Sequence, residues 1–161
     1  MQRMNQFDHR QLIVLDTNVC LDLFVFRDPR SAPILAALQN GSVRAVTRED
    51  CRMEWRIVLT YPHLGLDQDA RTRVAAEFDA LIECLPPAAT GSAAPLPVCS
   101  DPDDQKFLEL TRDARAEILI TKDKALLKLA KKTARAGLFS IMLPDAWVQD
   151  ALPENEMSGS N

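Results

Sequence analysis

The chain has 161 residues, of which 47% are apolar and 26% charged, and its formal net charge is −4 at pH 7. This length and composition are typical of one soluble globular domain, and the negative charge argues against a protein that coats nucleic acid non-specifically. No apolar run is long enough to cross a membrane, and the polar residues 1–10 do not resemble a signal peptide, so we expect a cytoplasmic protein.

An apolar run over residues 12–15 leads directly into Asp16, Thr17 and Asn18. A short apolar run bounded by turn-forming residues is typical of a strand buried on both faces, as in parallel sheets covered by helices. A packed helix is expected over residues 19–26. Asp16 would then lie at the carboxyl end of a buried strand, the edge at which open α/β sheets bind ligands.

The next elements are predicted from caps and β-branched residues. Ser31 can cap a helix that ends at Asn40-Gly41, and residues 43–46 indicate a strand. Thr47 resembles the first residue of a capping box, with Asp50 in place of the usual glutamate, so another helix is expected from this point.

Glu54 falls on the apolar stripe of that predicted helix, three residues after Cys51 and four before Val58. A carboxylate on an apolar stripe is costly unless it is paired or bound to a metal ion. Two interpretations remain open from spacing alone. Glu54 either belongs to a functional site, or it lies at the margin of the stripe and reaches water or an arginine such as Arg56.

Residues 67–84 have the pattern of a long amphipathic helix, and the Pro/Ala-rich residues 86–97 are expected to form an exposed loop. Residues 98–100 are interpreted as a short strand end. Asp101 followed by proline predicts a helix start, in which acids favour the helix dipole. Asp103 and Asp104 both follow, and spacing alone does not decide which of them faces the sheet.

Residues 117–121 form a second apolar run that ends in a polar residue and leads to Asp123, repeating the pattern around Asp16. A helix is expected from Ala125, a last strand over residues 137–143 and a short helix from Pro144. The helix after Asp123 carries a cationic stripe, which forms either a solvated face or a contact with phosphates: Lys124, Lys128, Lys131, Lys132 and Arg135.

Strands and helices alternate throughout, and the apolar runs do not alternate residue by residue. This pattern predicts an α/β domain with a central, mostly parallel sheet sandwiched by helices. We expect one domain over residues 11–150, with polar flexible segments at 1–10 and 151–161.

Four carboxylates share one description, because each follows a strand or lies on an inward helix face: Asp16, Glu54, Asp104 and Asp123. In one parallel sheet they would converge at the carboxyl edge, where ionised carboxylates need a counter-charge. The four cysteines show no C-x-x-C spacing and there are only two histidines, so the expected ion is a hard one, Mg²⁺ or Mn²⁺. Such a site favours cleavage of phosphodiester or phosphate-ester bonds.

Four motifs in this order make the chain resemble a PIN domain over about residues 11–150: LIVLDTN (12–18), CRMEWRIVL (51–59), DPDDQKFLEL (101–110) and ILITKDKALLKL (118–129). The resemblance is greatest to the toxin components of prokaryotic toxin–antitoxin systems, the VapC-type toxins. It implies a Mg²⁺- or Mn²⁺-dependent endoribonuclease, with a small antitoxin protein as a partner and a homodimer as the assembly.

The resemblance also implies a role for each matched residue. The metal-binding and catalytic acids would be Asp16, Glu54, Asp104 and Asp123, and the family pattern, not the spacing, selects Asp104 over Asp103. Polar residues that orient these acids would be Thr17 or Asn18, together with Thr121. Asp101 is assigned to helix capping, and Asp103 adds a further negative charge that either binds metal or caps.

RNA phosphates would meet Lys122, Lys124 and Lys128 close to Asp123, and Arg52 belongs to a second cationic stripe with Arg48 and Arg56.

Other classes of protein remain as alternatives. A haloacid-dehalogenase-like phosphatase requires a second aspartate where this chain has Asn18, and a phosphoacceptor receiver domain leaves the helix of Glu54 unexplained. A non-catalytic PIN-like module that binds RNA or protein would be expected to lack one of the four acids, and all four are present.

Overall fold

The computed structural model describes residues 10–87 and 93–151. Within these residues five strands form one sheet in the order β3-β2-β1-β4-β5, and all neighbouring strands are parallel. The predicted α/β class is confirmed. The strands are β1 (Gln11–Leu15), β2 (Val43–Arg48), β3 (Ile82–Leu85), β4 (Ile118–Ile120) and β5 (Ser140–Met142).

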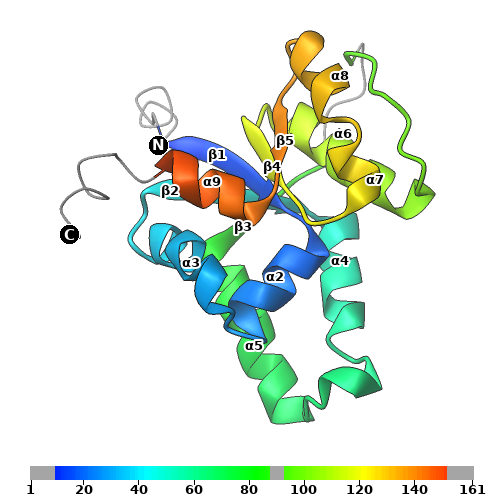
Figure 1. Ribbon diagram of the computed structural model, residues 1–161. Helices are drawn as coiled ribbons and strands as arrows, with labels where there is room; N and C mark the ends of the chain where they lie inside the picture. Colours follow the sequence, from blue (N-terminus) through cyan, green and yellow to red (C-terminus); the bar gives the residue numbers. More distant parts are fainter. Residues whose placement is uncertain (1–9, 88–92, 152–161) are drawn as a thin grey trace, which may run out of the picture.

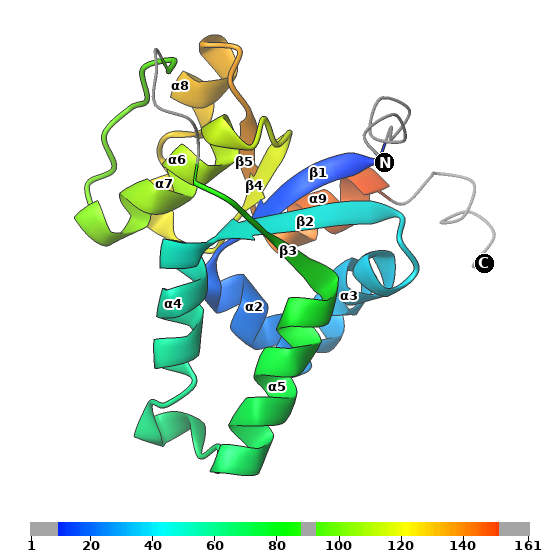
Figure 2. The ribbon, with the colours of Figure 1, turned by 180° about the vertical axis from the view of Figure 1, so that it is seen from behind.

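Helices cover both faces of this sheet (Figures 1 and 2). The core on one face includes side chains from α2 (Thr17–Phe24), α3 (Ala32–Gln39), α5 (Gln68–Leu81) and α9 (Pro144–Ala151). The core on the other face includes side chains from α6 (Gln105–Asp113), α7 (Lys124–Leu127) and α8 (Ala130–Arg135). Helix α4 (Glu49–Val58) contributes to both cores, and 3₁₀ turns lie at η1 (Pro29–Ser31), η2 (Pro62–Leu64) and η3 (Pro102–Asp104).

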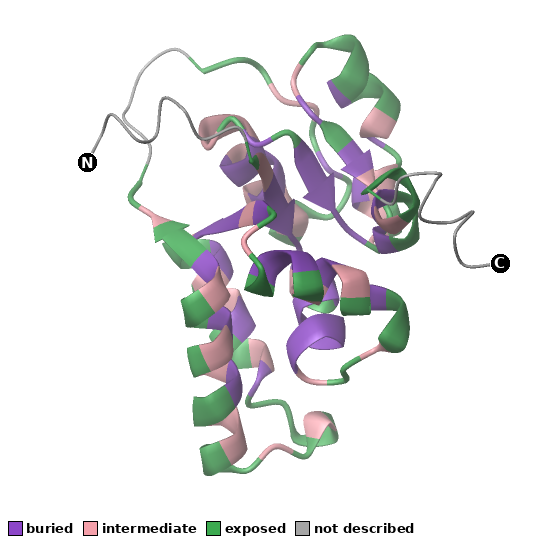
Figure 3. Cartoon of the chain, turned by 90° about the vertical axis from the view of Figure 1, so that its left-hand side faces the viewer, coloured by how far each residue is buried: buried purple, intermediate pink, exposed green. Residues whose placement is uncertain are grey.

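Strand β1 lies in the middle of the sheet, and its apolar sequence suits this position. Ile13 and Leu15 enter one core while Val14 enters the other, and Ile13 and Val14 are 0% exposed. Successive side chains of a strand point to opposite faces, so only an unbroken apolar run suits a strand covered on both sides. Figure 3 shows the sheet as a mostly buried layer between helices with exposed outer faces.

The register of the central strands determines where their carboxyl ends lie. Leu15 pairs with Ile120, so Asp16 and Thr121 follow at the same level of the sheet. Strand β1 leads towards β2 on one side, whereas β4 lies on its other side. The gap between the carboxyl ends of β1 and β4 is thus a topological switch point, the usual ligand position in open α/β sheets.

Two predicted element boundaries are wrong around β2 and β3. Strand β2 continues through Thr47 and Arg48, which pair with Cys84 and Leu85, so Thr47 does not open a helix or form a capping box. Helix α4 begins at Glu49 instead. The helix predicted over residues 67–84 ends at Leu81, because the chain turns directly into β3.

Smaller corrections concern the second half of the chain. Residues 98–100 form no strand, and the Cys99 N–H donates to Gln105 Oε1 at 2.7 Å. The helix expected from Ala125 is divided into α7 and α8. Part of the predicted 86–97 loop, residues 88–92, lies outside the described residues, as do residues 1–9 and 152–161 of the predicted flexible termini. Among the described helices, none has the length and apolar character that crossing a membrane requires.

Three aromatic rings anchor α2, α4 and α5 to one another. Trp55 stacks on Phe78 with 5.1 Å between ring centroids, and Phe24 meets both rings edge-on. All three side chains are at most 3% exposed. This cluster fixes α4, and therefore the main chain at Glu54, relative to α2 and α5.

We predict that Phe78→Ala lowers the free energy of unfolding by about 3–5 kcal/mol, because it removes buried apolar area and leaves a cavity. Urea denaturation measures this change. Ile57→Ala on the exposed side of α4, where Ile57 is 51% exposed, is the control and should change the free energy by less than about 0.5 kcal/mol. Equal effects of the two substitutions would contradict the role of the cluster.

Candidate active site

Asp16 is buried at the junction of β1 and α2, where its side chain caps the helix. The Val19 N–H donates to Asp16 Oδ1 at 2.9 Å, and the Thr121 hydroxyl donates to Oδ2. Burial raises the pKa of Asp16 to about 6, although the hydrogen bonds from Thr121 and Val19 oppose this and only the nearby Asp123 carboxylate adds to it. The fold therefore holds a carboxylate where its negative charge is disfavoured without a cation.

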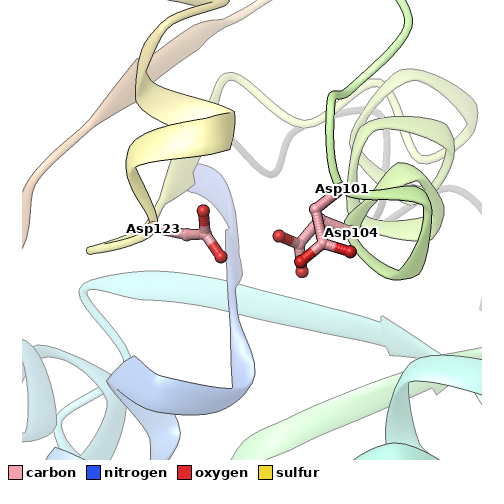
Figure 4. A group of neighbouring side chains, drawn as sticks. All are labelled: Asp101, Asp104 and Asp123. Atoms are coloured by element: carbon pink, nitrogen blue, oxygen red, sulfur yellow. The ribbon is translucent and has the colours of Figure 1, made fainter.

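Asp101, Asp104 and Asp123 form a cluster beside it, which we call the aspartate cluster. One carboxylate oxygen from each residue lies within 4.8 Å of those of the other two. Figure 4 shows the Asp123 side chain extending from the start of α7 towards Asp101 and Asp104 on the opposite wall. The cluster joins the segment after β4 to η3, which are separated by a helix and a strand along the chain.

Local hydrogen bonds determine how two of these side chains point. The Asp103 N–H donates to Asp101 Oδ1 at 3.0 Å, and the Ala125 N–H donates to Asp123 Oδ1 at 2.8 Å, so both aspartates cap the turns that follow them. The Asp123 N–H also donates to the Thr121 hydroxyl at 2.9 Å. Thr121 thus connects Asp16 to Asp123.

Asp104 is the member of the cluster with a buried carboxylate oxygen that lacks a partner. Its Oδ2 is buried and has no hydrogen-bond partner among the described residues. Burial, and then the adjacent Asp123 carboxylate, raise the pKa of Asp104 to about 7. A buried oxygen of this kind is costly unless a proton or a cation satisfies it.

The aspartate cluster fits a hard divalent cation. Its donors are carboxylate oxygens alone, the ligands that Mg²⁺ and Mn²⁺ prefer, and one of them is buried without a partner. An ion there would also lower the electrostatic repulsion that raises the pKa of Asp104. Asp101, Asp104 and Asp123 are therefore the residues that would hold it, with Asp16 as a further buried carboxylate beside Asp123.

Glu54 does not belong to the aspartate cluster within the described residues. The Thr17 hydroxyl donates to Glu54 Oε2, and Lys106 Nζ donates to Oε1 at 2.8 Å. Partial burial lowers the pKa of Lys106, but the hydrogen bond to Glu54 and its charge outweigh this, so the net pKa is raised and the ammonium is retained. Glu54 is thus paired, as the second interpretation expected, but its partner is Lys106 and not Arg56.

The other predicted acids and amides lie at the margin of the site. Asn18 is exposed on α2, and Asp103 is exposed in η3 with only main-chain contacts. Asp16, whose two oxygens both accept hydrogen bonds, is 4% exposed, which disfavours the phosphatase alternative because its first aspartate must attack substrate.

The predicted cationic residues divide into two groups. Arg52 forms a bidentate ion pair with Asp79 at 3.0 Å, and Lys122 pairs with the buried Asp22 at 2.5 Å. By contrast, Lys124 and Lys128 are exposed and have no ion pair within the described part of the chain. Lys124 directly follows Asp123 and Lys128 lies one helical turn further on, whereas Arg52 joins α4 to α5.

Sequence reasoning missed Lys106 and the double role of Asp101. Lys106 follows the Asp-Pro motif, but the sequence gives no sign that it contacts a glutamate 52 residues away. The sequence predicts only a capping role for Asp101. In the structure Asp101 caps η3 and also belongs to the aspartate cluster. The proximity of two further aspartates at η3 was the available signal.

The comparison with known families gives one match. The family model for the PIN domain matches residues 12–125, a span that includes β4, all of β1 but its first residue, and the whole aspartate cluster. The search of curated proteins gave no match. PIN domains are generally nucleases and typically use divalent metal ions. With this match over more than two thirds of its length, the chain belongs to the PIN domain family.

Proposed function

We propose that the protein is a Mg²⁺- or Mn²⁺-dependent endoribonuclease. The observation that carries the proposal is the aspartate cluster at the switch point between β1 and β4, with the unpartnered Asp104 Oδ2 within it. A divalent cation there supplies Lewis acidity towards a phosphoryl oxygen and increases the acidity of water at neutral pH. Oxygen ligands and a phosphate substrate are both suited to these ions.

The surrounding residues hold this site in one arrangement. Thr121 fixes one oxygen of Asp16, and the Val19 N–H fixes the other, so that the carboxylate cannot rotate away. Asp123 is restrained by the Ala125 N–H in the same manner. Ligands restrained by such neighbours lose little conformational entropy when a cation binds.

We further propose that RNA phosphates contact the exposed cationic face of α7 and α8. Leu126, Leu129 and Thr133 are buried at helical spacing, so the opposite face points to solvent. That outer face carries Lys124, Lys128, Lys131, Lys132 and Arg135, all exposed. Their position directly after Asp123 supports a path for RNA across these two helices, in spite of the net negative charge of the chain.

The resemblance of the four motifs to VapC-type toxins supports a narrower role. We propose that the nuclease is the toxin of a toxin–antitoxin pair, that it acts in the cytoplasm, and that a small antitoxin protein inhibits it. Phosphodiester cleavage of cellular RNA is an activity that a cell must restrain, which is consistent with such a partner.

Asp104→Asn tests the nuclease proposal. We expect loss of RNA cleavage on the order of a hundredfold or more, because the substitution removes the charge of a metal ligand while preserving its shape. The measurement is cleavage of a mixed panel of structured and single-stranded RNAs with Mg²⁺, Mn²⁺ or EDTA. Asp69→Asn, at an exposed position on α5, is the matched control and should cleave as the wild type does.

The same variants test the proposed toxin role. Induced expression of the wild type in bacteria should stop growth, and Asp104→Asn should not. Full cleavage activity in Asp104→Asn would show that the reaction takes place elsewhere in the molecule.

The raised pKa values of Asp16 and Asp104 predict how pH affects stability. Both groups have an ordinary pKa of 3.8, and their folded values are about 6 and about 7. Between these limits the folded chain binds more protons than the unfolded chain, so the free energy of unfolding falls as pH rises from about 4 to about 7. The metal-free protein should therefore be more stable at pH 5 than at pH 7.5.

Thermal unfolding in EDTA at several pH values measures this dependence. Mn²⁺ at pH 7.5 should restore the melting temperature, because an ion bound only by the folded state stabilises it. Asp104→Asn should flatten the pH dependence and reduce the response to Mn²⁺. An increase in stability from pH 5 to pH 7.5 in EDTA would contradict the raised pKa values of Asp16 and Asp104.

Lys124→Ala combined with Lys128→Ala tests the RNA path. Each lost phosphate contact should reduce the slope of log affinity against log salt by about 0.7 for single-stranded RNA, so the double variant should lose about 1.4. Fluorescence anisotropy in EDTA measures binding without cleavage. Arg73→Ala removes an exposed charge on α5 and should leave the slope unchanged. An unchanged slope in the double variant would show that these lysines contact solvent and not RNA phosphates.

A further inference from the structure

Lys106 extends from α6 to α4 and lies at the edge of the candidate active site. Its ammonium contacts Glu54 Oε1 at 2.8 Å and also donates to the main-chain oxygen of Asp103. The Lys106 side chain is 19% exposed and that of Glu54 is 30% exposed, so the pair is partly shielded from solvent. The Lys106 ammonium also lies 5.3 Å from the centre of the Phe107 ring, which favours a cation there.

Both oxygens of Glu54 have partners without any metal ion. Lys106 binds one and the Thr17 hydroxyl binds the other, and within the described residues Glu54 is in no group of acids spaced to hold an ion. The opposite holds for Asp104, whose buried Oδ2 has no partner in the same part of the chain. The site thus contains one carboxylate that already has a counter-charge and a separate cluster that lacks one.

We propose that the Lys106 ammonium takes the place of a second metal ion, so that the site binds one divalent cation at the aspartate cluster. Lys106 supplies the other positive charge, paired with Glu54. The proposal rests on the nuclease function proposed above.

The donors of Lys106 indicate how it would meet substrate. An ammonium group has three donors, of which Glu54 and Asp103 take two. The third N–H is available to a negatively charged oxygen of an RNA phosphate. Lys106 is then a substrate-binding residue of the site as well as the counter-ion of Glu54.

The number of bound ions tests the proposal directly. The metal-free full-length chain is titrated with Mn²⁺ at pH 7.5, and unbound Mn²⁺ is followed by electron paramagnetic resonance beside calorimetry. We expect one tightly bound ion in the wild type. In Lys106→Met, which frees Glu54 and removes a positive charge, a second Mn²⁺ should bind, with affinity at least about tenfold higher than any second site of the wild type.

Three variants control for indirect effects. Lys106→Arg keeps the positive charge and should bind one ion. Glu54→Gln should also bind one ion with unchanged affinity, because Glu54 is not a ligand of the first ion; this variant keeps the proposal testable if Lys106→Met folds poorly. The double variant Glu54→Gln/Lys106→Met should return to one ion, since the freed carboxylate is absent.

The outcomes separate this inference from the proposed function. Two ions of similar affinity in the wild type, a Lys106→Met variant identical to the wild type, or a Glu54→Gln variant with weakened binding of the first ion would each overturn the role of Lys106 and leave the metal-dependent nuclease intact. A wild type that binds no Mn²⁺ would overturn both.

Discussion

The close approach of Asp101, Asp104 and Asp123, with Asp16 buried beside Asp123, is the constraint on which the rest of the site depends. Carboxylates at this separation repel one another when ionised, and burial increases the cost. The fold tolerates the arrangement because strongly packed elements determine it. Strand β1 is covered on both faces, and Thr121 and the helix caps fix the side chains that follow the strands. The core thus maintains a charge distribution that only a proton or a cation relieves.

The parts of the fold that follow from local sequence were predicted well. Strands β1 and β4 are unbroken apolar runs, which only a doubly covered strand accommodates, and the polar residues after them mark the functional edge. Strand β3 was missed because it follows α5 without a break, and Ile82 continues the helical spacing of Phe78. The next two residues of β3, Glu83 and Cys84, are exposed, so they carry no strand signal. The error at Thr47 follows from the same omission, since β3 is the partner that extends β2.

Long-range contacts explain which features of the site could not be predicted. Spacing did not separate Asp103 from Asp104, and the structure distinguishes them because η3 turns one carboxylate into the cluster and the other towards solvent. The partner of Glu54 depends on how α4 packs against α6, a contact that no local pattern encodes. Long-range ion pairs likewise engage Arg52 and Lys122, which sequence alone cannot distinguish from the exposed Lys124. Burial and pairing, not residue type, decide which charges remain available.

One feature shared by Asp16, Asp101 and Asp123 has an evolutionary consequence. Each of these side chains accepts a hydrogen bond from the main chain and so begins a helical turn. Asparagine can cap a helix about as well as aspartate. A single exchange at any of these three positions can therefore remove negative charge from the site while retaining the start of the turn. The charge at this edge of the sheet and the fold beneath it can therefore change separately in evolution, because the loss of one of these carboxylates leaves in place the helical turn that it caps.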